Sequence, residues 1–208
     1  MTSHPELRLL AIAGPPLLDP ARMVDACRAA EQGGVTAVQV RWKDAPVGDL
    51  VQVTTEVVRA LSIPVFVNDR ADVAWAAGAR GVHLGADDLP VDRVRGVSPS
   101  LWCIGTSVGD VDEATAACLT GADYWGVGPV CSTSTKDDAG QAIGVVGFQR
   151  LAALAPAATV VLAIGGVDAD TARSVMGVGA DGVAVSRAVF GSGDITRAAA
   201  RLWAIVAP

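Results

Sequence analysis

Short apolar runs recur along the chain at nearly even intervals, and alanine-rich stretches with helical periodicity lie between them. Four runs open with glycine, at positions 34, 78, 121 and 179, and read "GVTAVQVR", "GARGVHLG", "GADYWGVG" and "GADGVAVS". Four others alternate with these and read "LRLLAIAG", "IPVFVN", "LWCIGTS" and "TVVLAIGG". A glycine just past an amphipathic stretch is typical of a helix C-cap that leads into a strand. The pattern therefore predicts eight alternations of strand and helix.

This alternation favours parallel strands joined by crossover helices. In a chain of 208 residues, eight such units predict one α/β domain, a compact (β/α)8 TIM barrel over residues 1–208, with residues 1–6 as a flexible tail. A doubly wound open parallel sheet is the alternative. The even number of repeats favours the closed barrel, because barrel strands contribute side chains in alternating layers.

One connection is longer than the others. The opening glycines are spaced by 44, 43 and 58 residues, and the excess lies in "CSTSTKDDAGQAIG", after the sixth expected strand. A long loop inside a compact domain often has a function. A disordered surface insertion is the alternative interpretation.

Side chains alternate between the two faces of a strand. In the second expected strand Val38 and Val40 share one face, and Gln39, Arg41 and Lys43 share the other. The valines suit the layer against the helices, so the polar set is expected to face the barrel interior and its carboxyl-terminal mouth. Inward-facing polar groups need polar partners.

Aligning the repeats compares the residues that reach the mouth. The equivalent positions are Arg41, Gly85, Gly128 and Ser186. Three small residues beside one cation leave room for a ligand. The same alignment places His83 level with Gln39, pointing inward. We favour a core histidine with satisfied hydrogen bonds; a group that supports a ligand-binding residue is the alternative.

Acidic residues follow two neighbouring expected strands. Asn68-Asp69 comes directly after the third, and Asp87-Asp88 follows the fourth. Because neighbouring parallel strands are about 4.8 Å apart, Asp69 and Asp88 can approach a common point. Hard oxygen ligands suit Mg²⁺, which often combines one or two carboxylates with substrate phosphates. Each aspartate could instead cap the helix that follows it.

The ends of the last two expected strands have the form of a phosphate site. "AIGG" and "AVSR" offer backbone N–H groups near helix starts, an arrangement that favours an anion. Glycines in ordinary tight turns would give the same sequence pattern. The phosphate-site interpretation therefore depends on the pattern occurring at two neighbouring strand ends.

Composition excludes several classes of protein. The net charge of −6, the pI near 4.8 and the absence of a basic cluster argue against nucleic acid as a partner. "LRLLAIAG" is too short to span a membrane, and no basic stretch precedes it as in a signal peptide. Four dispersed cysteines without a CxxC favour buried thiols in a reducing compartment. We expect a cytoplasmic protein; its oligomeric state, including a homo-oligomer, stays open.

The basic residues are unevenly divided, with 14 Arg and only Lys43 and Lys136 as lysines. A coding bias that replaces surface lysine with arginine explains the scarcity. It does not explain why both lysines follow expected strands at the mouth.

Several of these segments, taken in order, resemble thiamine phosphate synthases. They are "VQVRWKD", "VNDRADVAWAAGARGVHLGADDLP", "IGTS", "GVGPVCSTSTKDD", "AIGGV" and "GADGVAVS". The resemblance extends from Leu9 to Arg187. It implies an enzyme that joins a hydroxymethylpyrimidine diphosphate to a hydroxyethylthiazole phosphate, releasing pyrophosphate and forming thiamine phosphate. The loop "STSTKDDAGQAIG" and the stretch "GTSVGD" depart from the family pattern, which often has a histidine after that serine.

The resemblance also implies roles for individual residues. It assigns the pyrimidine diphosphate to Gln39, Arg41, Lys43, Asn68, Ser107 and Lys136, the metal Mg²⁺ to Asp69 and Asp88, and the thiazole phosphate to Thr133, Thr135, Gly165, Gly166, Val185 and Ser186. Arg41 and Lys136 are the expected catalytic residues, because negative charge builds on the leaving diphosphate.

Three other functions compete with this one. A thiazole tautomerase would use a catalytic histidine after the fifth strand, where "GTSVGDVDE" has none. A Schiff-base aldolase needs a lysine inside a strand in apolar surroundings, and neither Lys43 nor Lys136 fits. A non-catalytic barrel that binds a phosphate ligand would not need the aspartate pair and both lysines.

Overall fold

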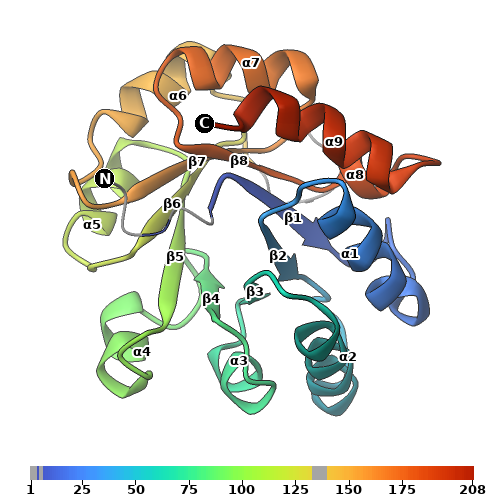
Figure 1. Cartoon of the computed structure of the whole chain (residues 1–208). Helices are drawn as coiled ribbons and strands as arrows, with labels where there is room; N and C mark the ends of the chain where they lie inside the picture. Colours follow the sequence, from blue (N-terminus) through green and yellow to red (C-terminus); the bar gives the residue numbers. More distant parts are fainter. Residues whose placement is uncertain (1–3, 5–6, 133–139) are drawn as a thin grey trace.

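The structure is a computed structural model that describes residues 4, 7–132 and 140–208. Strands and helices alternate throughout (Figure 1). The strands are β1 Leu9–Ala13, β2 Ala37–Val40, β3 Val65–Asn68, β4 Gly81–Leu84, β5 Cys103–Val108, β6 Tyr124–Val127, β7 Val160–Ile164 and β8 Gly182–Val185. The helices are η1 Pro20–Arg22, α1 Met23–Gln32, α2 Val47–Ala60, α3 Ala71–Ala76, α4 Val91–Val97, α5 Val111–Ala117, α6 Gly144–Ala152, α7 Ala169–Gly177, α8 Arg187–Phe190 and α9 Ile195–Val206.

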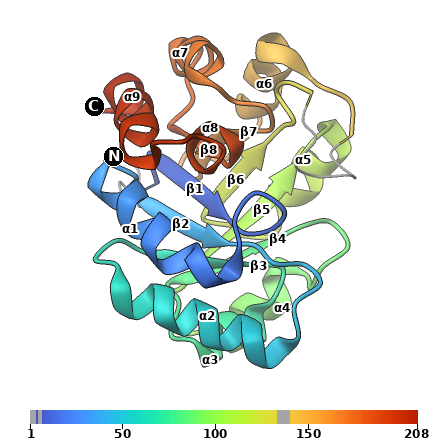
Figure 2. The same ribbon diagram turned by 90° about the vertical axis from the view of Figure 1, so that its right-hand side faces the viewer.

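The sheet closes on itself. Each strand pairs in parallel with the next in sequence, and β8 pairs with β1 through the register Leu9↔Val183. The helices surround the strands in Figure 1, and Figure 2 shows β1 and β2 from the side, running in the same direction. The (β/α)8 barrel predicted from the sequence is confirmed, and the open-sheet alternative is wrong.

The repeated glycines have the conformation that the C-cap interpretation requires. Gly34, Gly78, Gly121 and Gly179 have φ angles of 97°, 70°, 71° and 102°. These values lie in the left-handed region, where a residue without Cβ is favoured. Gly34, Gly78 and Gly179 directly follow the C-caps of α1, α3 and α7, whereas Gly121 lies three residues past the C-cap of α5, in the segment that leads to β6.

The strands separate two apolar cores. Val38 and Val40 belong to the core between the strands and the helices, as predicted. Phe66, Tyr124 and Leu162 belong to the second core, inside the barrel. The inner core holds large side chains because glycine lies beside them: a Cβ on Gly105 would overlap the Tyr124 ring.

The long connection lies between β6 and α6, where the sequence placed it. Its two ends are held together, since Ile143 N donates to Pro129 O at 2.9 Å and Gly144 N donates to Val130 O at 3.0 Å. Residues 133–139 lie outside the described part of the chain.

The four cysteines form no disulfide in the structure, as expected, but they are not all buried. Cys27 and Cys103 are buried, Cys131 is half-buried, and Cys118 is exposed at the C-cap of α5. The Cys118 thiol donates to Leu154 O at 3.3 Å. Burial raises the pKa of the Cys27 thiol to about 12, which makes it an unreactive core group.

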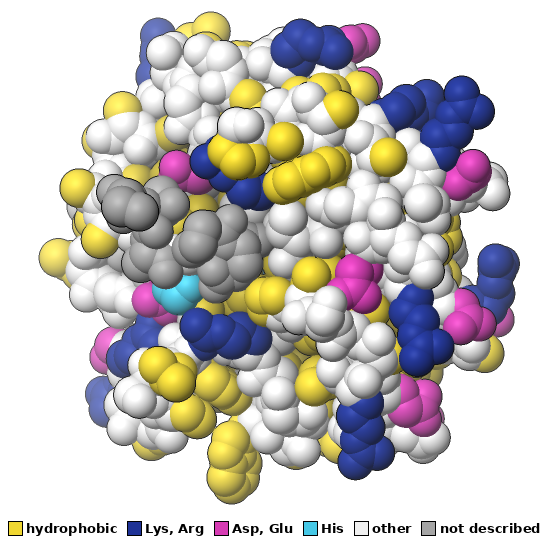
Figure 3. All heavy atoms as spheres, viewed as in Figure 1, with side chains coloured by type: hydrophobic (Ala, Val, Ile, Leu, Met, Phe, Trp, Pro, Cys, Tyr) yellow, Lys and Arg dark blue, Asp and Glu magenta, His cyan; other side chains and the backbone are white. Residues whose placement is uncertain are grey.

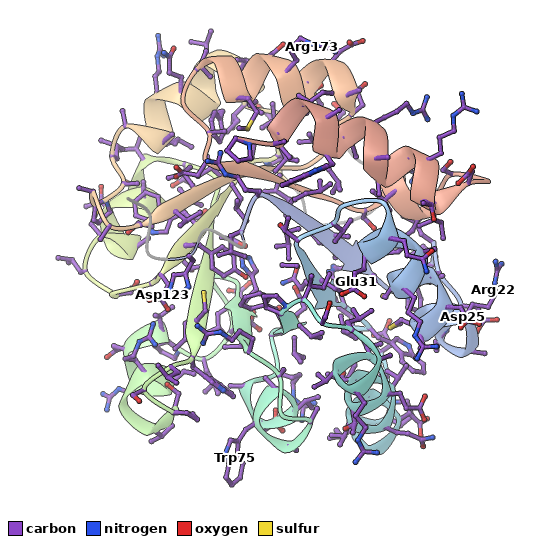
Figure 4. All side chains as sticks on the ribbon, in the orientation of Figure 1. Arg22, Asp25, Glu31, Trp75, Asp123 and Arg173 are labelled. Carbon is purple, nitrogen blue, oxygen red and sulfur yellow. The ribbon has the colours of Figure 1, made fainter. Side chains whose placement is uncertain are left out.

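The outer surface is mixed in character. On the face in Figure 3, basic side chains are dispersed among acidic and apolar ones. Trp75 of α3 points away from the barrel and is 72% exposed (Figure 4). Among the described residues, no helix is long and apolar enough to cross a membrane. Of residues 1–6 only His4 is described, so the flexible tail stays a prediction.

The inner core gives a stability prediction. Gly105→Ala should lower the free energy of unfolding by about 1–3 kcal/mol, because the new methyl group displaces the Tyr124 ring. Gly96→Ala in α4 is the matched control. A Cβ there meets nothing within 4 Å, so alanine should stabilise the helix by about 0.5–1 kcal/mol. Urea denaturation measures both, and equal effects would contradict the packing argument.

Candidate active site

Polar side chains from neighbouring strands meet above the inner core. Gln39 of β2 is only 2% exposed, and its Nε2 donates to Oδ1 of Asn68, the last residue of β3, at 3.4 Å. Asn68 is level with His83 of β4 in the strand register. The expectation that Gln39 points into the barrel and finds a polar partner is confirmed.

The two aspartates of the strand ends come together as predicted. The Asp69 N–H donates to His83 O at 2.8 Å, so Asp69 continues the backbone pairing of β3 with β4. The Asp88 Oδ2 accepts a hydrogen bond from Gly85 N at 2.7 Å. The Asp69 and Asp88 side chains are themselves in hydrogen-bonding contact. Asp69 has a φ of 65°, in the left-handed region, so its position is set by these contacts and not by backbone preference.

Neither aspartate caps a helix. The N-cap of α3 is Arg70 and that of α4 is Pro90, and neither has a side-chain capping bond. Other aspartates do perform this role. Asp110 accepts from Glu113 N at the start of α5, and Asp168 accepts from Thr171 N at the start of α7. The capping alternative for Asp69 and Asp88 is therefore wrong.

The aspartate pair is electrostatically unfavourable without a cation. Burial, followed by the hydrogen bond and the charge of Asp88, raises the pKa of Asp69 to about 6, while the charges of Lys43 and Arg41 lower it. Two ionised carboxylates in contact repel each other, so one of the two groups tends to hold a proton. A hard divalent cation would replace that proton, and carboxylate oxygens are suitable ligands. The residues therefore fit a site for Mg²⁺.

The cations act on this pair from the end of β2. Arg41 is fixed through its backbone, because its N–H donates to Ala13 O at 2.8 Å. The charges of Arg41 and Lys43 both lower the pKa of Asp69, so both act on this carboxylate. Two positive charges beside two carboxylates suit an anion that is held partly through a metal.

Ser107 of β5 belongs to a buried hydrogen-bond chain. His83 Nε2 lies 3.1 Å from Ser107 Oγ, and His83 Nδ1 lies 3.1 Å from the Tyr124 hydroxyl. His83 is thus a satisfied histidine in the barrel interior, and it also supports Ser107. Both interpretations of His83 from the sequence are partly correct.

The ends of β7 and β8 form a second group, across the barrel from the aspartates in the strand order. Gly165 and Gly166 have φ angles of 85° and 64°. The Cys131 N–H donates to Gly165 O at 2.9 Å, so the segment after β6 packs against them. A Cβ on Gly166 would lie 2.9 Å from the carbonyl oxygens of both Cys131 and Ser132. Only glycine fits this turn.

Two residues of the second group offer a ligand fewer hydrogen-bonding atoms than the sequence suggested. Val185 is 3% exposed and packs in the core against the helices, so only its backbone can face a ligand. The Ser186 hydroxyl donates to Ile12 O at 2.8 Å. That hydroxyl can still accept a hydrogen bond, but its proton is already engaged.

Three predicted site residues lie outside the described part of the chain: Thr133, Thr135 and Lys136. The remaining predicted side chains are distributed over the two groups at the mouth. Their roles in binding stay predictions.

The opposite end of the barrel carries another cluster of potential ligands. His4, Cys103 and Asp123 have ligand atoms within 4.8 Å of one another. Asp123, labelled in Figure 4, already pairs with Arg95 and accepts from Ile104 N at 2.7 Å. Asp181 makes the same kind of contact to Val161 N at 2.8 Å. Since both aspartates join neighbouring strands in this way, the role of Asp123 is structural.

Sequence reasoning missed Tyr124 as a member of the polar chain. A tyrosine in an apolar run is usually taken for a core residue, and Tyr124 is indeed fully buried. The available signal was small residues at inward positions of adjacent strands, Gly105 and Gly126, which leave room for two rings.

Fold and site together define a class: a (β/α)8 barrel enzyme with paired carboxylates and cations at the carboxyl ends of its strands. The family model described as thiamine monophosphate synthase matches residues 9–189. The chain belongs to this family.

Individual relatives agree with this assignment. The chain is 44% identical over 181 residues to the thiamine-phosphate synthase of Methanoculleus marisnigri, covering 86% of this chain and 85% of that one. It is 39% identical over 207 residues to that of Azorhizobium caulinodans, covering 98% and 97%. The solved structure of thiamine phosphate pyrophosphorylase from Pyrococcus furiosus superimposes with a TM-score of 0.87 at 36% identity, covering 98% and 96%.

The aspartate pair gives a prediction about stability. Without metal at pH 8, Asp88→Asn should raise the free energy of unfolding by about 1 kcal/mol, because it removes the charge that repels the Asp69 carboxylate. The expected gain is small because water screens the charge of a half-buried group. The folded pKa of Asp69, about 6, exceeds its ordinary value of 3.8. Protonation of Asp69 thus favours folding below about pH 4, and this contribution is lost as the pH rises through 6. The advantage of the variant should therefore shrink at pH 5.

The measurement is urea denaturation at both pH values, with and without MgCl2. Asp87→Asn is the control, because Asp87 is exposed and adjacent in sequence. Added Mg²⁺ should stabilise the native protein and the control but not Asp88→Asn. If both variants behave alike, the two carboxylates do not form one site.

Proposed function

We propose that this protein joins 4-amino-2-methyl-5-hydroxymethylpyrimidine diphosphate to hydroxyethylthiazole phosphate, giving thiamine phosphate and pyrophosphate. The observation that carries the proposal is the Asp69–Asp88 contact within the fields of Arg41 and Lys43 at the barrel mouth. The names of the relatives support the same product. The proposal makes the enzyme a transferase with two phosphorylated substrates.

Asp69 and Asp88 would hold Mg²⁺. When bound there, the ion supplies positive charge to the diphosphate, as Mg²⁺ commonly does for phosphate groups. Arg41 and Lys43 add fixed positive charge from the end of β2. Lys136, from the long connection after β6, would add a further charge beside the same leaving group.

The bond changes follow a dissociative displacement. The C–O bond between the pyrimidine methylene and the diphosphate breaks, and the electron pair leaves with the pyrophosphate. The aminopyrimidine ring carries the positive charge that remains. The thiazole nitrogen then donates its lone pair to the methylene carbon and forms the new C–N bond. The protein needs no nucleophile for this route; it stabilises the leaving charge, orients the two rings and excludes water.

The second substrate would bind across the mouth. In the Gly165–Gly166 turn, Gly165 is half-buried and Gly166 is exposed, and Ser186 together with the backbone of Val185 lies at the adjacent strand end. Backbone N–H groups of such turns bind phosphate well. Thr133 and Thr135 would complete this subsite from the long connection. The two phosphorylated ligands would then approach each other above Gln39, Asn68 and Ser107.

Thiazole tautomerisation is less well supported. The chain contains only two histidines, His4 and His83. His83 is engaged on both ring nitrogens, with Tyr124 and Ser107. His4 precedes β1 in the sequence and therefore lies toward the amino-terminal end of the strands, away from the mouth. Neither histidine is placed to move protons on a thiazole ring.

The proposed function is tested by supplying both substrates with MgCl2 and measuring pyrophosphate and thiamine phosphate. We expect equal amounts of the two products, and no pyrophosphate when the thiazole phosphate is omitted, apart from slow hydrolysis. Asp88→Asn should lose most of this activity, whereas Asp87→Asn should keep it. Isomerisation of a thiazole substrate without pyrophosphate release would refute the proposal.

Lys136 provides a second test. If it contacts leaving-group oxygens, the contact strengthens as the C–O bond breaks, and its loss falls mainly on kcat. Lys136→Ala should lower kcat about 10²-fold with little change in Tm. Lys136→Arg should recover part of the loss, because a planar fork does not reproduce a point charge. Gln141→Ala, an exposed position in the same connection, is the control and should keep full activity.

A further inference from the structure

Three residues form a hydrogen-bond chain through the barrel interior. Tyr124 of β6, His83 of β4 and Ser107 of β5 are linked by two contacts of 3.1 Å each. Tyr124 is fully buried, and His83 is 7% exposed. The chain runs from the inner core toward the mouth, because Ser107 follows Cys103 and Gly105 along β5 on the inward face.

Packing fixes the orientation of both rings. The His83 and Tyr124 ring centroids are 5.4 Å apart, and Phe66 packs edge-on against Tyr124 at 5.8 Å. A Cβ on Gly126 would lie 3.2 Å from His83 Cε1, so the imidazole fills the space that this glycine leaves. The rings therefore cannot rotate freely, and the hydrogen bonds keep one geometry.

The phenol determines the direction of the hydrogen bonds. Burial raises the pKa of the Tyr124 hydroxyl far above its ordinary value, so the hydroxyl keeps its proton. A buried O–H needs an acceptor. Among the described residues, the hydrogen bond found for this hydroxyl is the one to His83 Nδ1.

The proton of the Tyr124 hydroxyl determines which atoms donate and which accept in the rest of the hydrogen-bond chain. A neutral imidazole has one donor and one acceptor nitrogen. If Nδ1 accepts from Tyr124, the proton is on Nε2, which donates to Ser107 Oγ. The Ser107 oxygen then accepts from His83, so its own O–H can donate to a different acceptor.

We propose that Tyr124 and His83 are positioning residues that fix the Ser107 hydroxyl as a hydrogen-bond donor toward the substrate. This inference rests on the proposed function, in which Ser107 contacts the pyrimidine diphosphate. It adds a requirement on that substrate: the atom facing Ser107 is an acceptor, either a ring nitrogen or a diphosphate oxygen. If Nδ1 carried the proton instead, the hydrogen bonds would run in the opposite direction and Ser107 would be an acceptor. The substrate atom facing it would then be a donor, such as the amino group of the pyrimidine.

The first test observes the tautomer directly. The chain has only two histidines, so ¹⁵N-histidine labelling gives a simple spectrum, and His4→Gln identifies the His83 signals. We expect an unprotonated Nδ1 and a protonated Nε2 in His83, and loss of this preference in Tyr124→Phe. A protonated Nδ1 in the native protein would overturn the proposal.

The second test measures whether the chain acts through Ser107. Tyr124→Phe should raise the KM for the pyrimidine diphosphate about 3- to 10-fold, the range expected for one hydrogen bond. The KM for the thiazole phosphate should stay unchanged. In a Ser107→Ala background the same substitution should have no further effect. An equal effect in both backgrounds would mean that Tyr124 acts on folding alone, and the proposal would fail.

A third pair of variants separates hydrogen bonding from packing. Glutamine offers a carbonyl oxygen as acceptor and an NH2 group as donor, so His83→Gln can keep the direction of the hydrogen bonds, whereas His83→Leu cannot. We expect His83→Gln to retain a lower KM for the pyrimidine diphosphate than His83→Leu at matched Tm. Equal KM values would overturn the proposal. If the native protein forms no thiamine phosphate, the proposed function fails, while the ¹⁵N measurement still decides the direction of the chain.

Discussion

The pairing of β8 with β1 is the constraint on which the site depends. Once Leu9 is level with Val183, the eight strands form a ring, and all carboxyl ends lie on one rim. Residues as distant in sequence as Gln39 and Ser186 then border the same opening. An open sheet would leave β1 and β8 without these partners and would spread the same side chains along an edge. Closure therefore does more than satisfy backbone hydrogen bonds, because it converts a sequence of strand ends into a concave site.

The aspartate pair shows a conflict between folding and function. Asp69 is held by the backbone contact to His83, and Asp88 by its contact to Gly85, so neither can move away easily. Their repulsion is partly relieved by Arg41 and Lys43, and a metal would relieve the rest. Sites that hold like charges together are preorganised for a ligand at the expense of the empty protein. The helix-capping aspartates of α5 and α7 have no such conflict, since each compensates backbone donors.

The sequence was informative where one residue type has one structural meaning. Glycines at helix ends predicted the repeat, and strand alternation placed Gln39 inside the barrel and Val38 outside. The approach of Asp69 to Asp88 followed from strand adjacency. Side-chain direction at strand ends was harder to predict. Ser186 donates its proton to Ile12, Val185 packs outward, and Tyr124 reaches His83 across the intervening strand β5. These contacts depend on ring size and register, which a linear pattern does not encode.

The bonds that join the ends of the long connection have a separate consequence. Because Ile143 returns to Pro129 and Gly144 to Val130, backbone hydrogen bonds already join the two ends of the connection beside the barrel. The entropy of closing a loop grows only with the logarithm of its length, and doubling the length costs only about 0.6 kcal/mol. Apart from Cys131 and Ser132, which pack against Gly166, changes of length in this connection should therefore cost the barrel little stability. Evolution can adjust this segment to a substrate, and an engineer can exchange it, without redesigning the scaffold that carries it.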